Sequence, residues 1–528
     1  MSAQHWTPLA ARILAHAQRC PSRSAVVCDG EAISYERLTD RAWHCAARLR
    51  ALGLAPGDDR RVAILSSNSI DFAVVVVACQ FAGVAVAPIS GMIAADAQAR
   101  LLDDSNAAVL FYDADHAEQA AAAIRLLARP DDLVAVQIGR ASPAGAIGEP
   151  LSDQWLGSGT IENFQPVDLE PEWVSDLIYS SGTTGLPKGI VQSYAARSAA
   201  NVALAGLGIS DSSRVAQTVS LYSNYGLVSL YVVLWWAGTL HISRKFSAAG
   251  FVDLVARESI DMVWFVPATL VRAMSDPRLP SIVESRPCIK ICMGAPLSKD
   301  TKQAALAAWP GAFIEGYGQT ETSVISLLQA HAVPEEKLGS VGKVLASACV
   351  RIIDDAGREL PCGAIGEIAA HTSTMMSGYF GRSDANAATY WNDATGRRFV
   401  RTGDIGKLDE DGFLWLCDRK KDMIISGGLN IYPADIEREL QAHPAVLEAA
   451  VVGCASRRWG ETPVAVVTPR VGTEATEEEI RAWVNRRVGK AQRVAAVRLV
   501  STLPTGTMGK VLKRELREQL TRELGTLP

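Results

Sequence analysis

The chain has 528 residues, more than one hydrophobic core usually organises, so we expect two or more domains. Hydrophobic residues make up 48% and charged residues 21%, which is the composition of an ordinary globular protein. The formal net charge of −5, without long runs of like charge, argues against a general nucleic-acid binder.

Ten cysteines are scattered along the chain without C-x-x-C pairs. Cys288 and Cys292 are nearest to each other, and two thiols alone make no metal site. This pattern is typical of reduced thiols in a cytosolic protein. The first residues lack a basic start followed by an apolar core, so we expect no secretory signal and a cytoplasmic location.

Two apolar runs, residues 70–88 and 225–242, are long enough to be compared with membrane spans. The first is interrupted by Asp71 and Gln80, and the second by Gly238. Neither supplies the roughly eighteen uninterrupted apolar residues of a spanning helix, so we expect both runs in a protein core and no membrane span.

Residues 1–140 alternate short β-rich runs with helical patterns. The Asp29-Gly30 pair between two short apolar runs predicts a hairpin, and an apolar face stepping by three and four residues predicts a helix ending near Gly53. Strands are predicted at residues 62–65, 84–88 and 107–112, and helices at 72–81 and 117–127. Such alternation indicates an α/β fold with mostly parallel sheets covered by helices.

The character of the chain changes again near the charged run at residues 418–422. Beyond it, Pro433 can open a helix, residues 446–452 and 464–467 read as strands, and Thr476 with Glu479 forms a capping box. We therefore predict a separate small α+β domain, with one continuous domain and a charged loop as the alternative.

Residues 179–190, YSSGTTGLPKGI, follow the predicted strand at residues 174–179 and combine hydroxyls, glycines and a lysine. Glycines let successive N–H groups converge on an anion, hydroxyls add neutral donors, and Lys188 adds a charge. The spacing differs from that of the P-loop, because Lys188 is followed by glycine. We interpret the segment as a phosphate cradle, the alternative being a polar turn.

A second motif, EGYGQTE at residues 315–321, places two glycines around Tyr317. The glycines allow its ring to lie flat against a planar ligand. Thr320 and Glu321 follow, and a carboxylate beside phosphates suits Mg²⁺. An ordinary turn is the alternative.

Two further segments carry charge suited to a nucleotide. Asp404, in RTGD at residues 401–404, follows an apolar run and is expected at a strand end, where its carboxylate could bind a ribose diol, and Arg419 could serve the same sugar. In LPTGTMGK at residues 503–510, glycines bracket a loop that delivers Lys510 to developing negative charge. A capping aspartate and surface charges are the alternatives.

Taken in order, these motifs resemble the adenylate-forming superfamily of acyl-CoA synthetases, adenylation domains and luciferases, from about residue 20 onward. The resemblance implies a large N-terminal domain (1–420) of layered sheets with a small β subdomain, and a small mobile α+β lid (421–528). It also implies two half-reactions: a carboxylate and Mg-ATP give acyl-AMP and pyrophosphate, and an acceptor then displaces AMP.

The resemblance assigns roles to the matching residues. Catalytic roles fall to Lys510, Thr320, Glu321 and Lys188, with Glu321 serving the metal; Lys421 is the hinge and Gly428 faces the acceptor channel. The residues implied to contact the nucleotide are Ser180, Ser181, Gly182, Thr183, Thr184, Gly185, Gly294, Ala295, Pro296, Glu315, Gly316, Tyr317, Gly318, Asp404 and Arg419. Those implied for the acid pocket are Tyr225, Ser229, Met293, Gly294, Gly316 and Val324.

The chain departs from the family at two places. Ser223 stands where many relatives have a histidine, and AQRV at residues 491–494 replaces a stretch that has an aromatic residue in some CoA ligases, although Trp459 and Arg493 remain. The mainly apolar pocket set favours a cyclic, aromatic or medium-chain acid.

We therefore expect an acid:CoA ligase that uses ATP and Mg²⁺, as a monomer or homodimer. The alternatives are an amide synthetase that acylates an amine or amino acid, an enzyme that loads a carrier protein, and a nucleotide-binding protein without catalysis. The last is disfavoured because Lys510 and Glu321 are both present.

Overall fold

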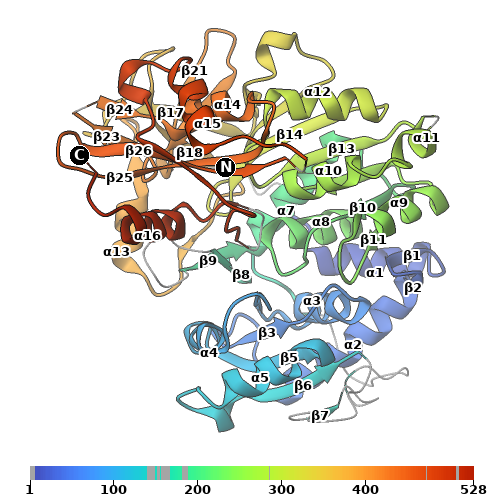
Figure 1. The fold of residues 1–528 in the computed structure, drawn as a ribbon. Coiled ribbons are helices and arrows are strands. Elements are labelled where there is room, and N and C mark those ends of the chain that lie inside the picture. Colours follow the sequence, from blue (N-terminus) through green and yellow to red (C-terminus); the bar gives the residue numbers. More distant parts are fainter. Residues whose placement is uncertain are drawn as a thin grey trace.

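The computed structural model describes residues 6–139, 149–150, 155, 167–180, 188–284, 286–427, 429–470, 472–506 and 510–527. They form an α/β protein with a large N-terminal domain and a smaller C-terminal domain, as predicted for the fold class (Figure 1). The cradle segment 181–187 and Gly428 lie outside the described residues. Among the described helices, none combines the length and hydropathy needed to cross a bilayer.

One mostly parallel sheet carries the strand that leads into the cradle. Its eight strands run in the order β19 (Gly378–Tyr379), β9 (Lys188–Ser193), β8 (Val174–Ser180), β4 (Val86–Pro88), β3 (Arg61–Leu65), β5 (Ala107–Asp113), β6 (Val134–Ile138) and β7 (Glu149–Pro150). Strands β8 and β9 pair antiparallel, with Ser180 opposite Lys188. Lys188 therefore begins a strand directly beyond the cradle segment.

A second, nine-stranded sheet carries the EGYGQTE motif on β14. Its order is β16 (Lys343–Val344), β15 (Ser323–Gln329), β14 (Phe313–Gln319), β13 (Ile289–Met293), β12 (Met262–Phe265), β10 (Arg214–Gln217), β11 (Thr239–Ile242), β1 (Ser24–Cys28) and β2 (Glu31–Ser34). The predicted hairpin is confirmed, because β1 and β2 pair antiparallel across Asp29-Gly30. Parallel pairing aligns Met293 with Gly316, so the MGAP loop begins beside the EGYG segment.

Helices cover both faces of these sheets. The largest apolar core involves α1 (Leu9–Arg19), α2 (Tyr35–Ala51), α3 (Ile70–Ala82), α7 (Tyr194–Ala203) and α8 (Asn224–Trp235). Helices α4 (Ala95–Asp104) and α5 (Ala117–Ile124) cover one outer face, and α9 (Ala248–Arg257), α10 (Pro267–Met274), α11 (Leu279–Val283) and α12 (Lys299–Ala308) cover another.

The two long apolar runs form parts of this interior, as predicted. Every residue of α3 from Phe72 onward is buried, as are most residues of α8. Gly83 ends α3 in the left-handed conformation, with φ +68°, which a glycine adopts without strain. The high hydropathy of these two runs is therefore explained by burial of α3 and α8 in the protein core and does not indicate membrane-spanning helices.

A small antiparallel sheet joins the two domains. Its order is β17 (Ala348–Ile353), β18 (Gly366–Thr372), β21 (Arg398–Leu408) and β20 (Tyr390–Asn392), with β22 (Leu414–Arg419) also on β21; α13 (Ser383–Thr389) lies nearby. The predicted position of Asp404 at a strand end is wrong, because β21 continues to Leu408. Gly403, with φ +67°, and a shift in register near Ile405 interrupt the pattern, and the strand resumes beyond them.

The residues after Met423 have their own sheet and core. The strands are β24 (Leu429–Ile431), β23 (Ile424–Ser426), β26 (Gly460–Pro469), β25 (Val446–Ser456) and β27 (Ala496–Leu499), and the helices are α14 (Pro433–Gln441), α15 (Glu477–Asn485) and α16 (Lys513–Leu524). The predicted capping box is confirmed: Thr476 N donates to Glu479 Oε2 at 2.8 Å, and Glu479 N donates to Thr476 Oγ1 at 3.2 Å. These elements, orange to red in Figure 1, gather on one side of the molecule.

Candidate active site

The carboxylate of Asp404 joins three strands of two different sheets. Tyr317 Oη and Gln319 Nε2, both on β14, donate to Asp404 Oδ2 at 2.7 Å each. Arg419 Nε on β22 lies 2.6 Å from Asp404 Oδ1, and the two residues are paired in register. Segments nearly ninety positions apart, the EGYGQTE and RTGD motifs, therefore meet at one buried carboxylate.

A second group forms where Glu321 faces the β8–β9 hairpin. Tyr379 Oη on β19 donates to Glu321 Oε1 at 3.0 Å. The ammonium of Lys188 lies 4.8 Å from the centre of the same tyrosine ring. Tyr379 thus contacts both the candidate phosphate-binding lysine and the candidate metal-binding carboxylate. The sequence analysis did not predict a role for this tyrosine.

Backbone contacts fix the turn that carries Thr320 and Glu321. Gln192 Nε2, on β9, donates to the carbonyl of Thr320 at 2.8 Å. The N–H of Met376 donates to the carbonyl of Glu321 at 2.8 Å. The turn is therefore attached to the sheet of the cradle on one side and to the chain before β19 on the other.

Lys510 belongs to the C-terminal domain, yet its charge interacts with groups of the N-terminal domain. Its pKa is lowered, first by partial desolvation and then by the cationic Arg419, while Asp404 and Glu321 oppose the shift. The loop that carries Lys510 is closed on itself, because Gly506 N donates to the carbonyl of Lys510 at 2.7 Å. Lys510 therefore interacts electrostatically with both carboxylates of the site.

The remaining nucleotide candidates in the described part of the chain include residues at the ends of strands from the two larger sheets. Gly294 follows β13 with φ +98°, and Ala295 and Pro296 continue this turn beside β14. Ser180 is the last residue of β8. The candidates Ser181, Gly182, Thr183, Thr184 and Gly185 fall outside the described residues.

Comparison with known proteins identifies the family. The model of the AMP-binding enzyme family matches residues 13–380, and that of the AMP-binding enzyme C-terminal domain matches residues 435–510. The chain belongs to the AMP-binding enzyme family. The expected resemblance and fold class are thereby confirmed.

Relatives match almost the whole length of this AMP-binding enzyme. A feruloyl-CoA synthase of Amycolatopsis is 33% identical, covering 95% of this chain and 97% of the relative. A fatty acid–[acyl-carrier-protein] ligase, ScoC, of Streptomyces coeruleorubidus is 31% identical, covering 96% and 95%. Among solved structures, ATP-bound MatB from Rhodopseudomonas palustris has a TM-score of 0.86 at 29% identity, covering 97% of this chain and 98% of that one. The amide bond synthetase McbA from Marinactinospora thermotolerans has a TM-score of 0.85 at 27% identity, covering 97% and 99%.

In this AMP-binding enzyme, Glu315 lies apart from the group around Asp404. It is buried and paired with Lys302 of α12, whose Nζ lies 2.5 Å from Glu315 Oε2. The same ammonium donates to the carbonyls of Leu338 at 2.7 Å and Ser340 at 3.0 Å. The Glu315 side chain thus attaches α12 to the sheet, and its contact with the nucleotide stays a prediction.

Four of the candidates for the acid pocket lie together. Tyr225 stacks on Trp264 with ring centres 5.1 Å apart. A methyl group added at Gly316 would come within 2.5 Å of the end of the Met293 side chain, so glycine is what lets Met293 occupy this place. Val324 packs on the same cluster. These side chains form an apolar wall next to the EGYG segment.

Ser229 and Ser223 use their hydroxyls within the protein. Ser229 is fully buried, and its Oγ donates to the carbonyl of Gly226 at 2.9 Å and contacts Gln217 Oε1. Ser223 Oγ accepts from Gly226 N at 3.1 Å and thereby caps α8. The predicted pocket hydroxyl of Ser229 is therefore committed to internal bonds, and Ser223 acts as a helix cap.

Asn68 is a further residue that the sequence did not reveal. Its Nδ2 donates to the carbonyls of Val219 and Ser243 at 3.1 Å each, and its Oδ1 accepts from Leu221 N at 2.7 Å. These bonds hold the segment that leads into α8 and Tyr225. A single asparagine gives no signal in one sequence, because its partners lie far along the chain.

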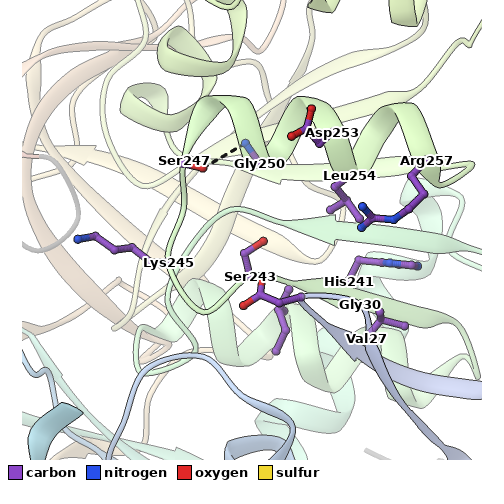
Figure 2. Close-up of a pocket in the computed structure, with 12 residues that line it drawn as sticks. Val27, Gly30, His241, Ser243, Lys245, Ser247, Gly250, Asp253, Leu254 and Arg257 are labelled. Atoms are coloured by element: carbon purple, nitrogen blue, oxygen red, sulfur yellow. Dashed lines mark hydrogen bonds between the residues drawn. The ribbon is translucent and has the colours of Figure 1, made fainter.

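A hollow of about 270 Å³ lies elsewhere, between the β1 and β11 ends and α9 (Figure 2). His241 lines it, and burial lowers the pKa of this histidine to about 4. Lys245 and Arg257 also line it. None of the residues around Asp404 or Glu321 lines this hollow. The candidate site is therefore identified from the contacts among its side chains and not from a cavity.

We predict that Lys302→Met destabilises the N-terminal domain by about 3–5 kcal/mol, because it leaves the buried Glu315 carboxylate without its cation. Burial already raises the pKa of Glu315 to about 7 against the effect of Lys302. Without Lys302 the carboxyl must bind a proton to stay buried, so the stability loss grows as pH rises above neutrality.

Urea unfolding followed by tryptophan fluorescence at several pH values measures this loss. Lys299→Ala, on the surface of the same helix, is the control, and the double variant Lys302→Met/Glu315→Leu should regain most of the stability. Equal stability of Lys302→Met and the control would contradict a structural role for the pair.

Proposed function

We propose that this AMP-forming carboxylate ligase joins an acid to the α-phosphate of ATP, releases pyrophosphate, and then transfers the acyl group to the thiol of CoA. The convergence of Asp404, Glu321, Lys188 and Lys510 from four distant segments carries the proposal. Relatives named feruloyl-CoA synthase and 2-succinylbenzoate–CoA ligase support CoA as the acceptor.

The sugar and base of the nucleotide are held by groups from β14, β21, β22 and the loop after β13. Asp404 and Arg419 bind the ribose, and Tyr317 with Gly294, Ala295 and Pro296 borders the adenine. A carboxylate accepts about four hydrogen bonds, and Asp404 already receives three from protein side chains. A ribose diol therefore takes the remaining position and replaces one of these donors.

The triphosphate lies between the cradle and Lys188. Ser180, Ser181, Thr183 and Thr184 donate hydroxyl and N–H groups to the β- and γ-phosphates, and Gly182 and Gly185 allow the backbone to approach. Lys188 adds a positive charge to the same phosphates. Thr320 serves the α-phosphate.

Glu321 fits a Mg²⁺ site completed by the phosphates of ATP. Among the described residues, no three carboxylate, thiol or imidazole side chains gather as a metal cage. Mg²⁺ in nucleotide enzymes is commonly held by one or two carboxylates and the phosphates, which is the donor set that Glu321 would complete. When bound, the ion would neutralise charge on the pyrophosphate leaving group.

Lys510 acts on the reacting groups themselves. When the acid carboxylate attacks the α-phosphorus, negative charge grows on the phosphoryl oxygens, and a positioned ammonium stabilises that charge more than the ground state. The electrostatic interactions of Lys510 with Arg419, Asp404 and Glu321 support this role. It bridges the acid carboxylate and the α-phosphate.

The acid packs against the apolar wall formed by Tyr225, Met293, Gly316 and Val324. The stacked pair of Tyr225 and Trp264 supplies a flat apolar surface. We therefore infer a cyclic, aromatic or medium-chain acid in preference to acetate or a polyanion.

The second half-reaction requires the C-terminal domain to turn about Lys421. Lys420 is anchored to the N-terminal domain, because its Nζ lies 2.7 Å from Asp355 and 3.1 Å from Glu367. Lys421 is the next residue, in the turn between β22 and β23. Turning there removes Lys510 and brings Gly428 to the acceptor channel.

Amide synthesis is the second candidate, supported by the similarity to an amide bond synthetase and by Ser223 in place of a histidine. Carrier-protein loading has the support of one ligase relative. The half-exposed Trp459, whose carbonyl accepts from Gly427 N at 2.8 Å, favours CoA because it offers an aromatic surface beside the acceptor segment.

The decisive experiment is ATP–pyrophosphate exchange with a panel of acids, followed by mass analysis of products. CoA, amino acids or a carrier protein is offered to the activated enzyme. Exchange with an apolar acid and an acyl-CoA product are expected. Exchange with no acid would contradict the ligase assignment, and an amide product would replace CoA with an amine as acceptor.

We predict that Lys510→Ala slows acyl-AMP formation at least about 10²-fold, because it removes a preorganised charge that acts in the transition state. Acyl transfer from supplied acyl-adenylate should be spared, and Lys299→Ala should leave both steps unchanged. Single-turnover measurements of each half-reaction test this. Equal loss in both half-reactions would contradict the role of Lys510.

The lowered pKa of Lys510 predicts a pH effect on the same step. Because the ammonium is the active form, adenylation should decline with rising pH earlier than an ordinary lysine would cause. Lys510→Arg keeps its charge and should move this decline to higher pH. Superimposable alkaline profiles for adenylation by the two enzymes would exclude Lys510 as the titrating group.

The hinge assignment predicts that Lys421→Pro impairs acyl transfer more than adenylation. Proline fixes φ and restricts Lys420 before it, which limits rotation at this turn. Rapid-quench measurement of each step, with Lys421→Ala as the matched control, tests this. A larger loss in adenylation than in transfer would argue for a different pivot.

A further inference from the structure

Tyr379 occupies a central position between two charged groups of the site. Its hydroxyl donates to Glu321 Oε1 at 3.0 Å, while the face of its ring lies 4.8 Å from Lys188 Nζ. The two charges thus contact different parts of one side chain: a polar tip and an aromatic face. A hydrogen bond to a carboxylate and a cation over a ring are both charge-assisted contacts, and each fixes a direction of approach.

Hydrogen bonds on two sides fix the backbone around Tyr379. Its β19 strand pairs with β9, with Tyr379 opposite Ile190, and Phe380 N donates to the carbonyl of Gly189 at 2.8 Å. On the other side, Asn386 Oδ1 accepts from Tyr379 N at 2.7 Å, and Asn386 Nδ2 donates to the carbonyl of Tyr379 at 2.9 Å. Because Lys188 begins β9, the pairing also sets the tyrosine against the lysine.

The hydroxyl of Tyr379 remains a donor. The phenol binds Oε1 at 3.0 Å and thereby fixes the orientation of the Glu321 carboxylate. Outer partners of this kind set the orientation of a metal-binding carboxylate.

We propose that Tyr379 is a positioning residue that holds the Glu321 carboxylate for the metal and the Lys188 ammonium for the phosphates of ATP. This inference rests on the proposed function, because it requires Glu321 to bind the metal. Tyr379 acts through these two neighbours. Its hydroxyl serves the metal and its ring serves the phosphates, so the two effects can be separated.

Two substitutions separate them. Tyr379→Phe removes the hydroxyl but keeps the ring under Lys188, whereas Tyr379→Leu removes both. Tyr390→Phe is the matched control, because Tyr390 is also partly buried near this sheet and its hydroxyl donates to the carbonyl of Met376, at 3.5 Å. Glu321→Gln reports the metal site itself, and melting temperatures check that every variant is folded.

The measurements are binding equilibria. Mn²⁺, an ion visible by electron paramagnetic resonance, is titrated into the enzyme with ATP, and ATP binding is measured separately by calorimetry in EDTA. Tyr379→Phe should weaken Mn²⁺ binding roughly tenfold or more while leaving metal-free ATP binding unchanged. Tyr379→Leu should weaken both, and Tyr390→Phe neither.

The outcomes distinguish this inference from the function beneath it. Normal Mn²⁺ binding by Tyr379→Phe, with loss in Glu321→Gln, would overturn the role of the tyrosine and leave the metal role of Glu321 intact. Normal Mn²⁺ binding by Glu321→Gln would overturn the metal assignment itself. If Tyr379→Leu does not fold, Mn²⁺ binding by Tyr379→Phe alone tests the effect on the metal site. Metal-free ATP binding by Lys188→Ala then shows whether the lysine contacts the phosphates.

Discussion

The buried carboxylate of Asp404 is the interaction on which the rest of the site depends. Its bonds to Tyr317, Gln319 and Arg419 join β14 of the large sheet to β21 and β22 of the small antiparallel sheet. A buried carboxylate is costly unless paired, so Asp404 needs these donors, or ligand hydroxyls that replace one of them, whenever the protein is folded. The same bonds hold the two sheets against each other. They also bring together the groups expected to bind the ribose and the adenine.

Local signals in the sequence predicted local structure well. The hairpin at Asp29-Gly30, the helix ending before Gly53 and the capping box of Thr476 and Glu479 depend on residues only a few positions apart. Alternating apolar runs likewise gave the α/β class, because burial on both faces of a parallel sheet leaves that pattern. Motif identity then placed Lys188, Glu321, Asp404 and Lys510 among the candidates before their proximity was visible.

The site residues that could not be predicted from the sequence were missed for one physical reason. Tyr379, Asn68 and Gln319 act through partners separated by long stretches of chain, and each is an ordinary polar residue of a strand or loop. Glu315 also shows this limit, because its side chain pairs with Lys302, a contact that the motif does not indicate. Which face a strand presents, and what covers that face, is decided by tertiary packing, and one sequence does not contain that information.

The boundary between the domains shows how one site can serve two reactions. Arg419 and Lys420 are bound to Asp404 and Glu367, so β22 stays with the large domain up to this point. Immediately afterwards the chain enters a turn and then the separate core of the small domain. In the proposed rotation, this anchor beside a turn confines the change to a few backbone dihedrals, and the small domain, Lys510 included, turns as one body. The nucleotide groups on the large domain can then remain assembled while the small domain exchanges the group that faces the phosphorus.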